Sequence, residues 1–124
     1  MQTRRQKMAQ QAAQALRDRD PGDTYGSYAK SFPALLHTAG LCQAVAFLQV
    51  KCPELLKDLI RTIGQEPNVE TFAERCRSAD VPEYMHLSRI CLDGATWLKR
   101  YVEAREKQDE AARQQAVVAN GSAE

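Results

Sequence analysis

The sequence predicts an all-α fold, a compact bundle of about five or six helices with a long C-terminal helix. Two observations lead to this prediction. Strong helix formers dominate the composition, with 18 alanines and 11 glutamines among 124 residues. Apolar residues recur at three- and four-residue spacing, and no stretch alternates apolar and polar residues as a half-buried strand would. A chain of this length has room for one core, so we expect residues 1–116 to form a single helical domain.

Three helices are expected in the first part of the chain. The segment Asp-Pro-Gly-Asp at 20–23 is a strong turn signal and is expected to end the first helix. Pro33 falls inside the second helix, where we expect a kink or a split because proline donates no backbone hydrogen bond. Gly40 is well placed to close that helix. The expected ranges of these helices are about 3–19, 24–39 and 41–51.

Three more helices are expected in the second part, each with its own start signal. Pro53 suits the first position of the fourth helix, and Gly64 suits its end. Asn68 is a preferred residue for capping the start of the fifth helix. Asp80 and Glu83 have capping-box spacing, which predicts the start of the sixth. The expected ranges are about 53–63, 69–76 and 81–116.

The sixth helix is predicted to be the longest, and its character changes along its length. Its apolar stripe is broad as far as Tyr101, and beyond that residue it contains only alanine among mixed charges. The second half is therefore expected to project from the bundle or to be supported by a partner. Residues 117–124 are expected to form a disordered tail. Four large residues on the predicted stripes are expected to be buried: Phe32, Leu48, Trp97 and Leu98.

Neither a membrane protein nor a secreted protein is expected from the sequence. The apolar runs are far shorter than the ~20 residues that span a bilayer, and the N-terminal segment lacks the apolar stretch of a signal peptide. The four cysteines, at positions 42, 52, 76 and 91, are too far apart for a CxxC pair. We interpret them as reduced, mostly buried thiols of a cytoplasmic protein.

Residues that could carry catalysis are few, and an enzyme is not expected. His37 and His86 are the only histidines, and neither has Cys, Asp or Glu at metal-ligand spacing on its own helix. Acidic residues are scattered singly along polar helix faces. The sequence contains no phosphate-binding or nucleophile motif of the common types. We therefore predict no metal site, no catalytic site and no cofactor.

Basic residues are the best candidates for a binding function. The net charge is only +1, but residues 1–19 contain five basic residues and one acidic residue. Such clusters neutralise phosphates without reading sequence, although basic residues on helices also serve solubility and ion pairing. The candidate RNA-binding residues are Lys51, Lys99, Arg100, Arg4, Arg5 and Lys7.

Three segments together suggest a family. Residues 25–51 read YGSYAKSFPALLHTAGLCQAVAFLQVK, and residues 84–104 read YMHLSRICLDGATWLKRYVEA. The first helix adds a Gln- and Arg-rich opening. Their order and spacing resemble the small α-helical subunit of the Cmr-type (type III-B) CRISPR RNA-guided effector complex. The resemblance covers about residues 3–105 and leaves the charged C-terminal segment unmatched.

The resemblance implies a non-catalytic structural subunit. Copies would stack into the minor filament of the complex, contact other subunits of the ribonucleoprotein and help form the channel for target RNA. Head-to-tail stacking of this kind is a heterologous contact that produces an open filament. Two alternatives remain: the small subunit of the related type III-A complex, and a helical nucleic-acid-binding regulator. No membrane partner is expected.

Overall fold

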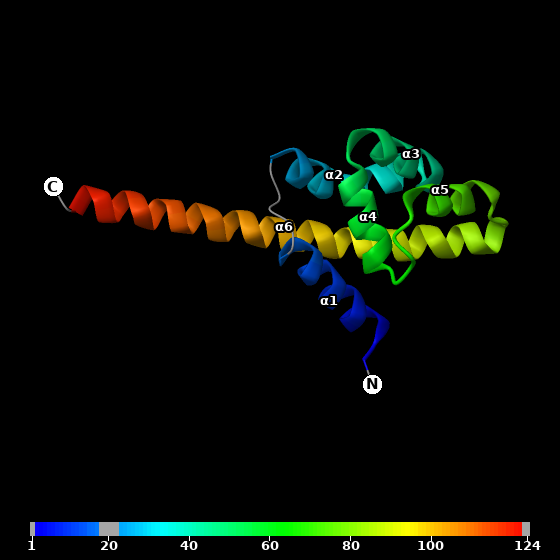
Figure 1. The fold of residues 1–124 in the computed structure, drawn as a ribbon, viewed down its shortest axis with the longest axis horizontal. Helices are drawn as coiled ribbons and strands as arrows, with labels where there is room; N and C mark the ends of the chain where they lie inside the picture. The colour runs from blue at the N-terminus through cyan, green and yellow to red at the C-terminus, as the bar shows by residue number, and fades with distance from the viewer. Residues whose placement is uncertain (1, 18–22, 123–124) are drawn as a thin grey trace.

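The computed structural model describes residues 2–17 and 23–122, and within them it confirms the all-α fold. Six helices are present in these residues, and Figure 1 labels them in chain order. The predicted turn at 20–23 lies almost entirely outside the described residues. The helices are α1 (Arg4–Arg17), α2 (Asp23–Ala39), α3 (Leu41–Lys51), α4 (Pro53–Thr62), α5 (Val69–Ser78) and α6 (Val81–Ser122).

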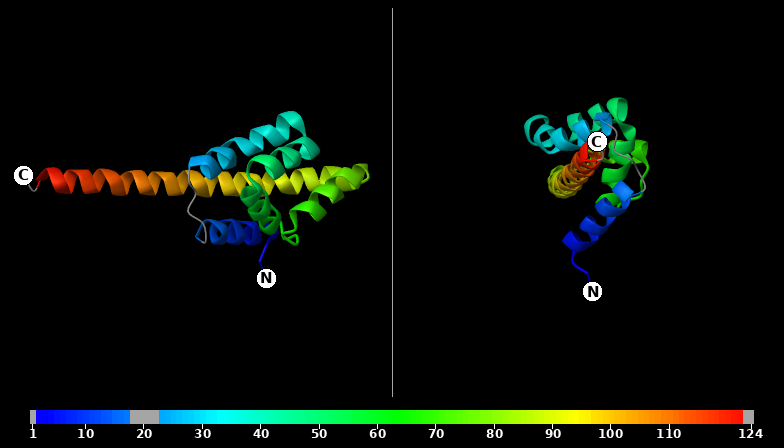
Figure 2. Two further views of the ribbon diagram at one scale, coloured as in Figure 1. Left: turned by 45° about the horizontal axis from the view of Figure 1, so that its top comes forward. Right: turned by 90° about the vertical axis from the view of Figure 1, so that its left-hand side faces the viewer.

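Helix α6 is the long axis of the molecule. Figures 1 and 2 show α1 on one side of it and α2 and α3 on the other. The short helix α4 contacts each of the other five helices. Its apolar face explains this central place, because Leu55, Leu56, Leu59 and Ile60 are all at most 2% exposed. Each helix in the described part of the chain is too short or too polar to cross a membrane.

The predicted core is confirmed at three of its four large residues. Phe32, Leu48 and Leu98 are buried within one continuous apolar cluster. The prediction for Trp97 is wrong, because this side chain is only partly buried. Successive residues of an α-helix point about 100° apart. With Leu98 at the centre of the buried stripe, Trp97 lies at its edge. Phe47 of α3 is 38% exposed.

One acidic residue is buried rather than scattered on the surface as the sequence suggested. Asp58 of α4 is 1% exposed, and its Oδ2 accepts a hydrogen bond of 2.6 Å from the hydroxyl of Tyr25. Thr62 Oγ1 donates to the Asp58 carbonyl oxygen at 2.7 Å. A buried carboxylate needs a donor such as the Tyr25 hydroxyl, since burying an unpaired polar group is costly. The Tyr25 bond therefore fixes the start of α2 against α4.

The predicted glycine stops are confirmed by their backbone conformations. Gly40 and Gly64 have φ angles of 86° and 81°, a region that side chains disfavour. The N–H of Gln65 donates to the carbonyl of Ile60 at 3.1 Å, as expected where a helix closes on a left-handed glycine. Pro33 does not split α2, which continues through it to Ala39.

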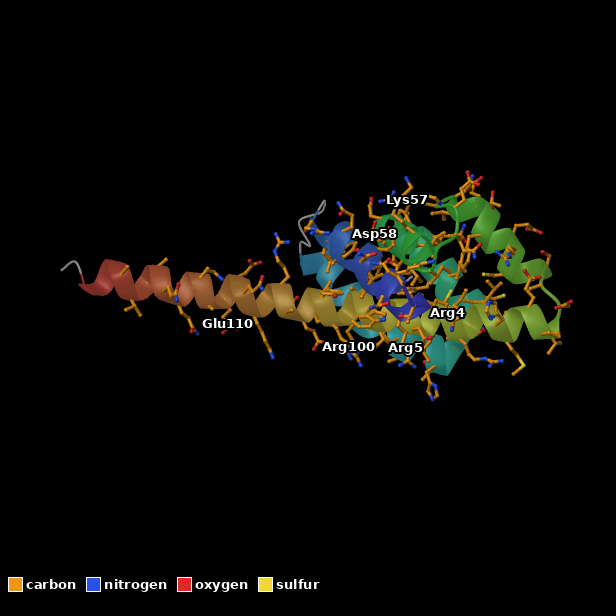
Figure 3. All side chains as sticks on the ribbon, turned by 90° about the horizontal axis from the view of Figure 1, so that it is seen from below. Arg4, Arg5, Lys57, Asp58, Arg100 and Glu110 are labelled. Carbon is orange, nitrogen blue, oxygen red and sulfur yellow. The ribbon has the colours of Figure 1, made fainter. Side chains whose placement is uncertain are left out.

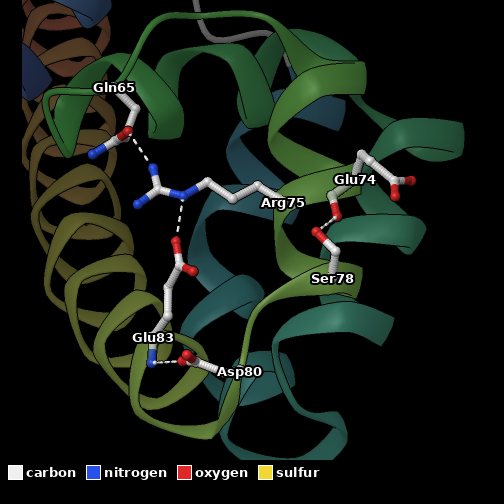
Figure 4. A network of polar contacts seen from close by, with 6 residues as sticks. All are labelled: Gln65, Glu74, Arg75, Ser78, Asp80 and Glu83. Carbon is white, nitrogen blue, oxygen red and sulfur yellow. Dashed lines mark hydrogen bonds and ion pairs between the residues drawn. The ribbon is translucent and has the colours of Figure 1, made fainter.

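The predicted N-terminal caps of α5 and α6 also form. Asn68 Oδ1 accepts from the N–H of Thr71 at 3.0 Å, and Asp80 Oδ1 accepts from the N–H of Glu83 at 3.0 Å. The Glu83 carboxylate binds Arg75 Nε at 2.7 Å instead of completing the reciprocal box. Figure 4 shows this pair together with Gln65, whose Oε1 accepts from Arg75 Nη1 at 2.6 Å. The Arg75 side chain thus joins α5, the start of α6 and the loop after α4.

The second half of α6 projects from the bundle, as predicted (Figure 1). Its last contacts with other helices in the described residues come from Arg105, whose Nη1 donates to the Leu16 carbonyl at 3.2 Å, and from Glu106, which pairs with Lys30 at 3.0 Å. The predicted end near residue 116 is too early, since the helix continues to Ser122. Residues 117–122, expected in a disordered tail, are therefore helical, and 123–124 lie outside the described residues.

Candidate nucleic-acid interface

The basic residues of α1 point away from the core because of the helix's narrow apolar stripe. On one face of α1, Met8, Ala12 and Leu16 are buried. This face packs against α4 and α6. Alanine lets the helices approach closely, so the remaining circumference stays in solvent. The basic residues of the first two turns are exposed there: Arg4, Arg5 and Lys7.

One pocket lies between α1 and α6, and we call it the α6 pocket. Its volume is about 210 Å³, and Arg5 lines it from α1. Figure 3 shows Arg5 and Arg100 on the same side of the molecule. Two candidate residues that are 95 positions apart in sequence therefore share one pocket. The lining residues are Arg5, Asp93, Thr96, Trp97 and Arg100.

A second pocket, between α1 and the end of α4, is called the α4 pocket. Its volume is about 520 Å³, and Arg4 and Lys7 line it together with Arg61 of α4 and Gln65 of the following loop. Its lining residues include three basic side chains and no acidic side chain. The start of α1 thus stands between two pockets.

These residues concentrate positive charge on a nearly neutral protein. The two pockets are lined by five basic side chains and one acidic side chain, whereas the whole chain has a net charge of +1. Such a local patch attracts polyanions even when the net charge is small. We call the patch the basic ridge, and it consists of Arg4, Arg5, Lys7, Arg61 and Arg100.

An aromatic stack borders the ridge. The rings of Trp97 and Tyr101 lie with centroids 6.0 Å apart and planes 23° apart. The guanidinium carbon of Arg100 lies 5.6 Å from the centroid of the Trp97 ring, a cation–π distance. Residues at i, i+3 and i+4 share a helix face, so α6 itself sets this arrangement.

Two predicted site residues lie away from the ridge. Lys51 is exposed at the end of α3, which lies across α6 from α1 (Figures 1 and 2). Lys99 is seven residues before Glu106, so both lie on the α6 flank that pairs with Lys30 of α2. Their neighbour Arg100 faces α1 instead. The structure therefore brings together four of the six predicted residues.

The sequence does not point to Arg61 or to the position of Trp97 at the edge of the core. Arg61 is one of several arginines on amphipathic helices, and only the packing of α1 on α4 places it beside Arg4. Trp97 was assigned to the core. Trp97 directly precedes Leu98, so it is rotated about 100° from the centre of the buried stripe. This spacing alone could have placed Trp97 at the edge of the core.

The cysteines are free thiols, and three of the four are buried, as expected. Burial raises the pKa of the Cys76 thiol to about 12, and the neighbouring Cys42 adds to the effect. Burial raises the pKa of the Cys91 thiol even further. Both thiols are therefore protonated at neutral pH. In the part of the chain that the structure describes, no group of three His, Cys, Asp or Glu side chains is placed to hold a metal ion.

The fold and site define a small helical protein with an exposed basic ridge beside an aromatic stack. Comparison with known proteins identifies it further. The family CRISPR-associated protein (Cas_Cmr5) matches residues 1–105, and the chain belongs to this family. The resemblance noted in the sequence is thus confirmed, and the residues after 105 lie outside the match.

A curated relative and a solved structure agree with this family. The chain is 35% identical over 111 residues to the CRISPR system Cmr subunit Cmr5 of Thermus thermophilus, covering 84% of this chain and 96% of the relative. A crystal structure of a CRISPR-associated Cmr5 family protein from the same organism superposes with a TM-score of 0.75 at 34% identity. That match covers 84% of this chain and 97% of the other.

Proposed function

We propose that this chain is a non-catalytic structural subunit of a type III-B CRISPR effector complex. The family match supports this proposal, as does the relative that is named as a Cmr subunit. In the proposed complex, copies stack into the minor filament against other subunits and help form the channel for target RNA. This function places the protein in the cytoplasm, which agrees with its four free thiols.

The observation that carries the RNA-channel role is the basic ridge. Five basic side chains line two pockets that α1 borders, where single-stranded RNA would be held by phosphate contacts that are independent of sequence. The ridge is small and the net charge is only +1. The isolated chain is therefore expected to bind RNA weakly, with strong binding requiring the assembled channel.

The stacking role has its own support in exposed apolar side chains. Val50 of α3 is 78% exposed, and Val81 and Met85 at the start of α6 are 72% and 53% exposed. Cys42 N donates to the Tyr84 hydroxyl at 3.2 Å, which holds the starts of α3 and α6 together. The exposed apolar residues at the start of α6 lie at one end of the elongated molecule (Figure 1), a position that suits a contact between subunits.

The experiment measures target-RNA binding to a reconstituted complex over a salt series. Replacing Arg4, Arg5 and Lys7 together by Gln should weaken binding and lower the salt slope by about 0.7 for each lost phosphate contact. The matched control replaces Lys51 and Lys99, which the sequence also suggests as RNA-binding residues but which lie outside the ridge. Equal affinities and slopes for wild type and the triple variant would reject the RNA-channel role.

A further inference from the structure

The α6 pocket has the components of a nucleotide-binding site. It joins a flat stacking surface, formed by Trp97 and Arg100, to a second guanidinium contributed by Arg5 of the neighbouring helix. Tyr101 stacks on the indole ring and supports it, with ring centroids 6.0 Å apart. Unpaired bases of RNA stack on aromatic rings and on arginine guanidinium planes.

The charged groups in this pocket are available to a ligand. Among the described residues, neither the Arg5 guanidinium nor the Asp93 carboxylate takes part in an ion pair within 4.0 Å. Thr96 Oγ1 already donates to the Leu92 carbonyl at 2.8 Å, so it is held by its own helix. The guanidinium groups of Arg5 and Arg100 suit a phosphate, and a carboxylate accepts hydrogen bonds from the amino group of a base.

Single-stranded RNA fits these groups better than a protein partner does. The rest of the ridge provides positive charge on the α4 side of α1, where Arg4, Lys7 and Arg61 would contact the phosphates that flank the bound nucleotide. An acidic peptide would satisfy the arginines but would be repelled by Asp93. The arginines require an anionic group, and Asp93 requires a hydrogen-bond donor. A nucleotide meets both requirements, because its phosphate is anionic and its base has neutral N–H donors.

We propose that the α6 pocket binds one unpaired nucleotide of single-stranded RNA. The base stacks against Trp97 and Arg100, the phosphate binds Arg5, and an amino group of the base donates to Asp93. Cytosine is therefore preferred to uracil, since uracil presents a carbonyl oxygen at the position of the cytosine amino group. This inference rests on the proposed RNA-channel role and adds a specific subsite to it.

The tryptophan provides a direct readout, because Trp97 is the only tryptophan in the chain. The full chain is titrated at low salt with short oligocytidylate and oligouridylate while indole fluorescence is recorded. Stacking of a base should quench the fluorescence, more strongly and at lower concentration for oligocytidylate. Asp93→Asn, which places both a donor and an acceptor in the pocket, should remove the preference for cytosine.

A second measurement uses labelled target RNA and the reconstituted complex. Arg100→Lys keeps the charge but removes the flat guanidinium, and it should weaken binding about fivefold or more. The matched control is Arg113→Lys, on the exposed projecting part of α6, which should leave binding unchanged.

The outcomes separate the pocket from the proposed function. If the complex binds RNA with a normal salt slope but Arg100→Lys has no effect, the nucleotide subsite is wrong and the RNA-channel role stands. If neutralising the ridge also has no effect on RNA binding, the channel role itself fails. If Trp97→Ala prevents assembly while RNA binding by the remaining subunits is normal, the pocket is a protein contact and the proposal is overturned.

Discussion

At the scale of single residues, the buried bond between Tyr25 and Asp58 shows how a polar group is tolerated in this core. The carboxylate is 1% exposed and accepts from Tyr25 at 2.6 Å. An apolar core tolerates a carboxylate only when donors replace the water it has lost. Sequence alone could not predict this pair, because the two residues are 33 positions apart and meet only where α2 packs against α4.

Tyr25→Phe is expected to lower the free energy of unfolding by about 1–3 kcal/mol, since it leaves a buried acceptor with one donor fewer. Urea unfolding followed by circular dichroism measures the change. Tyr28→Phe is the matched control, because Tyr28 is half-buried and packs its ring edge-on against Phe47, a contact that phenylalanine retains. Equal losses in the two variants would show that the Tyr25 hydroxyl has no special role.

The buried thiols make stability depend on alkaline pH. Burial raises the pKa of Cys76 to about 12 from its ordinary value of 9.0. Between these values the unfolded chain loses the thiol proton and the folded chain keeps it. The free energy of unfolding therefore falls as pH rises above about 9, by about 1.4 kcal/mol per pH unit for this thiol.

Urea unfolding at pH 8, 9 and 10 under reducing conditions tests this dependence. Cys76→Ala removes the thiol, so its stability should decline less steeply above pH 9 than that of the wild type. Other groups titrate in the same range, and the difference between the two slopes isolates Cys76. If the free energy of unfolding fell equally with pH in the two proteins, the Cys76 thiol would not be the cause of the decline.

At the scale of the elements, Gly94 lies where α6 packs closely against the end of α4 and Ile63. A β-carbon at this position would lie 2.8 Å from Ile63 Cγ2 and 3.2 Å from Leu59 Cδ1. Ile63 Cγ2 is attached to a branched β-carbon and has little freedom to move aside. A glycine within a helix is itself unfavourable by about 0.5–1 kcal/mol relative to alanine, and close packing explains its presence.

Gly94→Ala is expected to destabilise the protein by about 1 kcal/mol, because overpacking of about 1–3 kcal/mol exceeds the gain in helix propensity. Gly26→Ala is the comparison. Its β-carbon would meet the flexible end of Glu106 at 3.0 Å, so this variant should be neutral or more stable. Thermal unfolding of both variants shows which one is more stable. A Gly94→Ala variant more stable than the wild type would refute the close-packing explanation.

Helix starts and stops were the most predictable elements. Asn68, Asp80 and the two left-handed glycines act through local hydrogen bonds and backbone angles, which neighbouring residues determine. The end of α6 was not predictable in the same way. The alanine-rich sequence after residue 110 favours a helix but does not indicate at which residue the helix ends. Gly121 does not end α6, which continues to Ser122.

At the scale of the whole molecule, the candidate site depends on packing between distant segments. The cluster of Arg4, Arg5 and Lys7 was visible in the sequence, and Arg100 was selected beside it. Arg4 and Lys7 share one pocket with Arg61, and Arg5 shares another with Arg100, because α1 packs against both α4 and α6. Lys99 shows that neighbours in sequence can be separated in space. Successive residues of a helix point about 100° apart, so Lys99 lies on the other flank of α6 from Arg100.

The projecting part of α6 should be separable from the fold. Among the described residues, the last hydrogen bond and ion pair between α6 and the bundle involve Arg105 and Glu106, and the family match also ends at residue 105. A chain ending at Asp109 keeps these contacts, so its free energy of unfolding should stay within about 0.5 kcal/mol of the full chain.

A chain ending at Tyr101 makes the contrasting case. It loses Val102, which is 0% exposed, together with the bond from Arg105 to the Leu16 carbonyl and the Lys30–Glu106 pair. Burial of a valine side chain alone contributes about 1.5–3 kcal/mol, so this chain should lose at least about 2 kcal/mol. Urea unfolding of the three lengths measures both differences. A large loss in the chain ending at Asp109 would show that the projecting helix stabilises the bundle, whereas unchanged stability leaves residues 110–124 available for contacts outside this subunit.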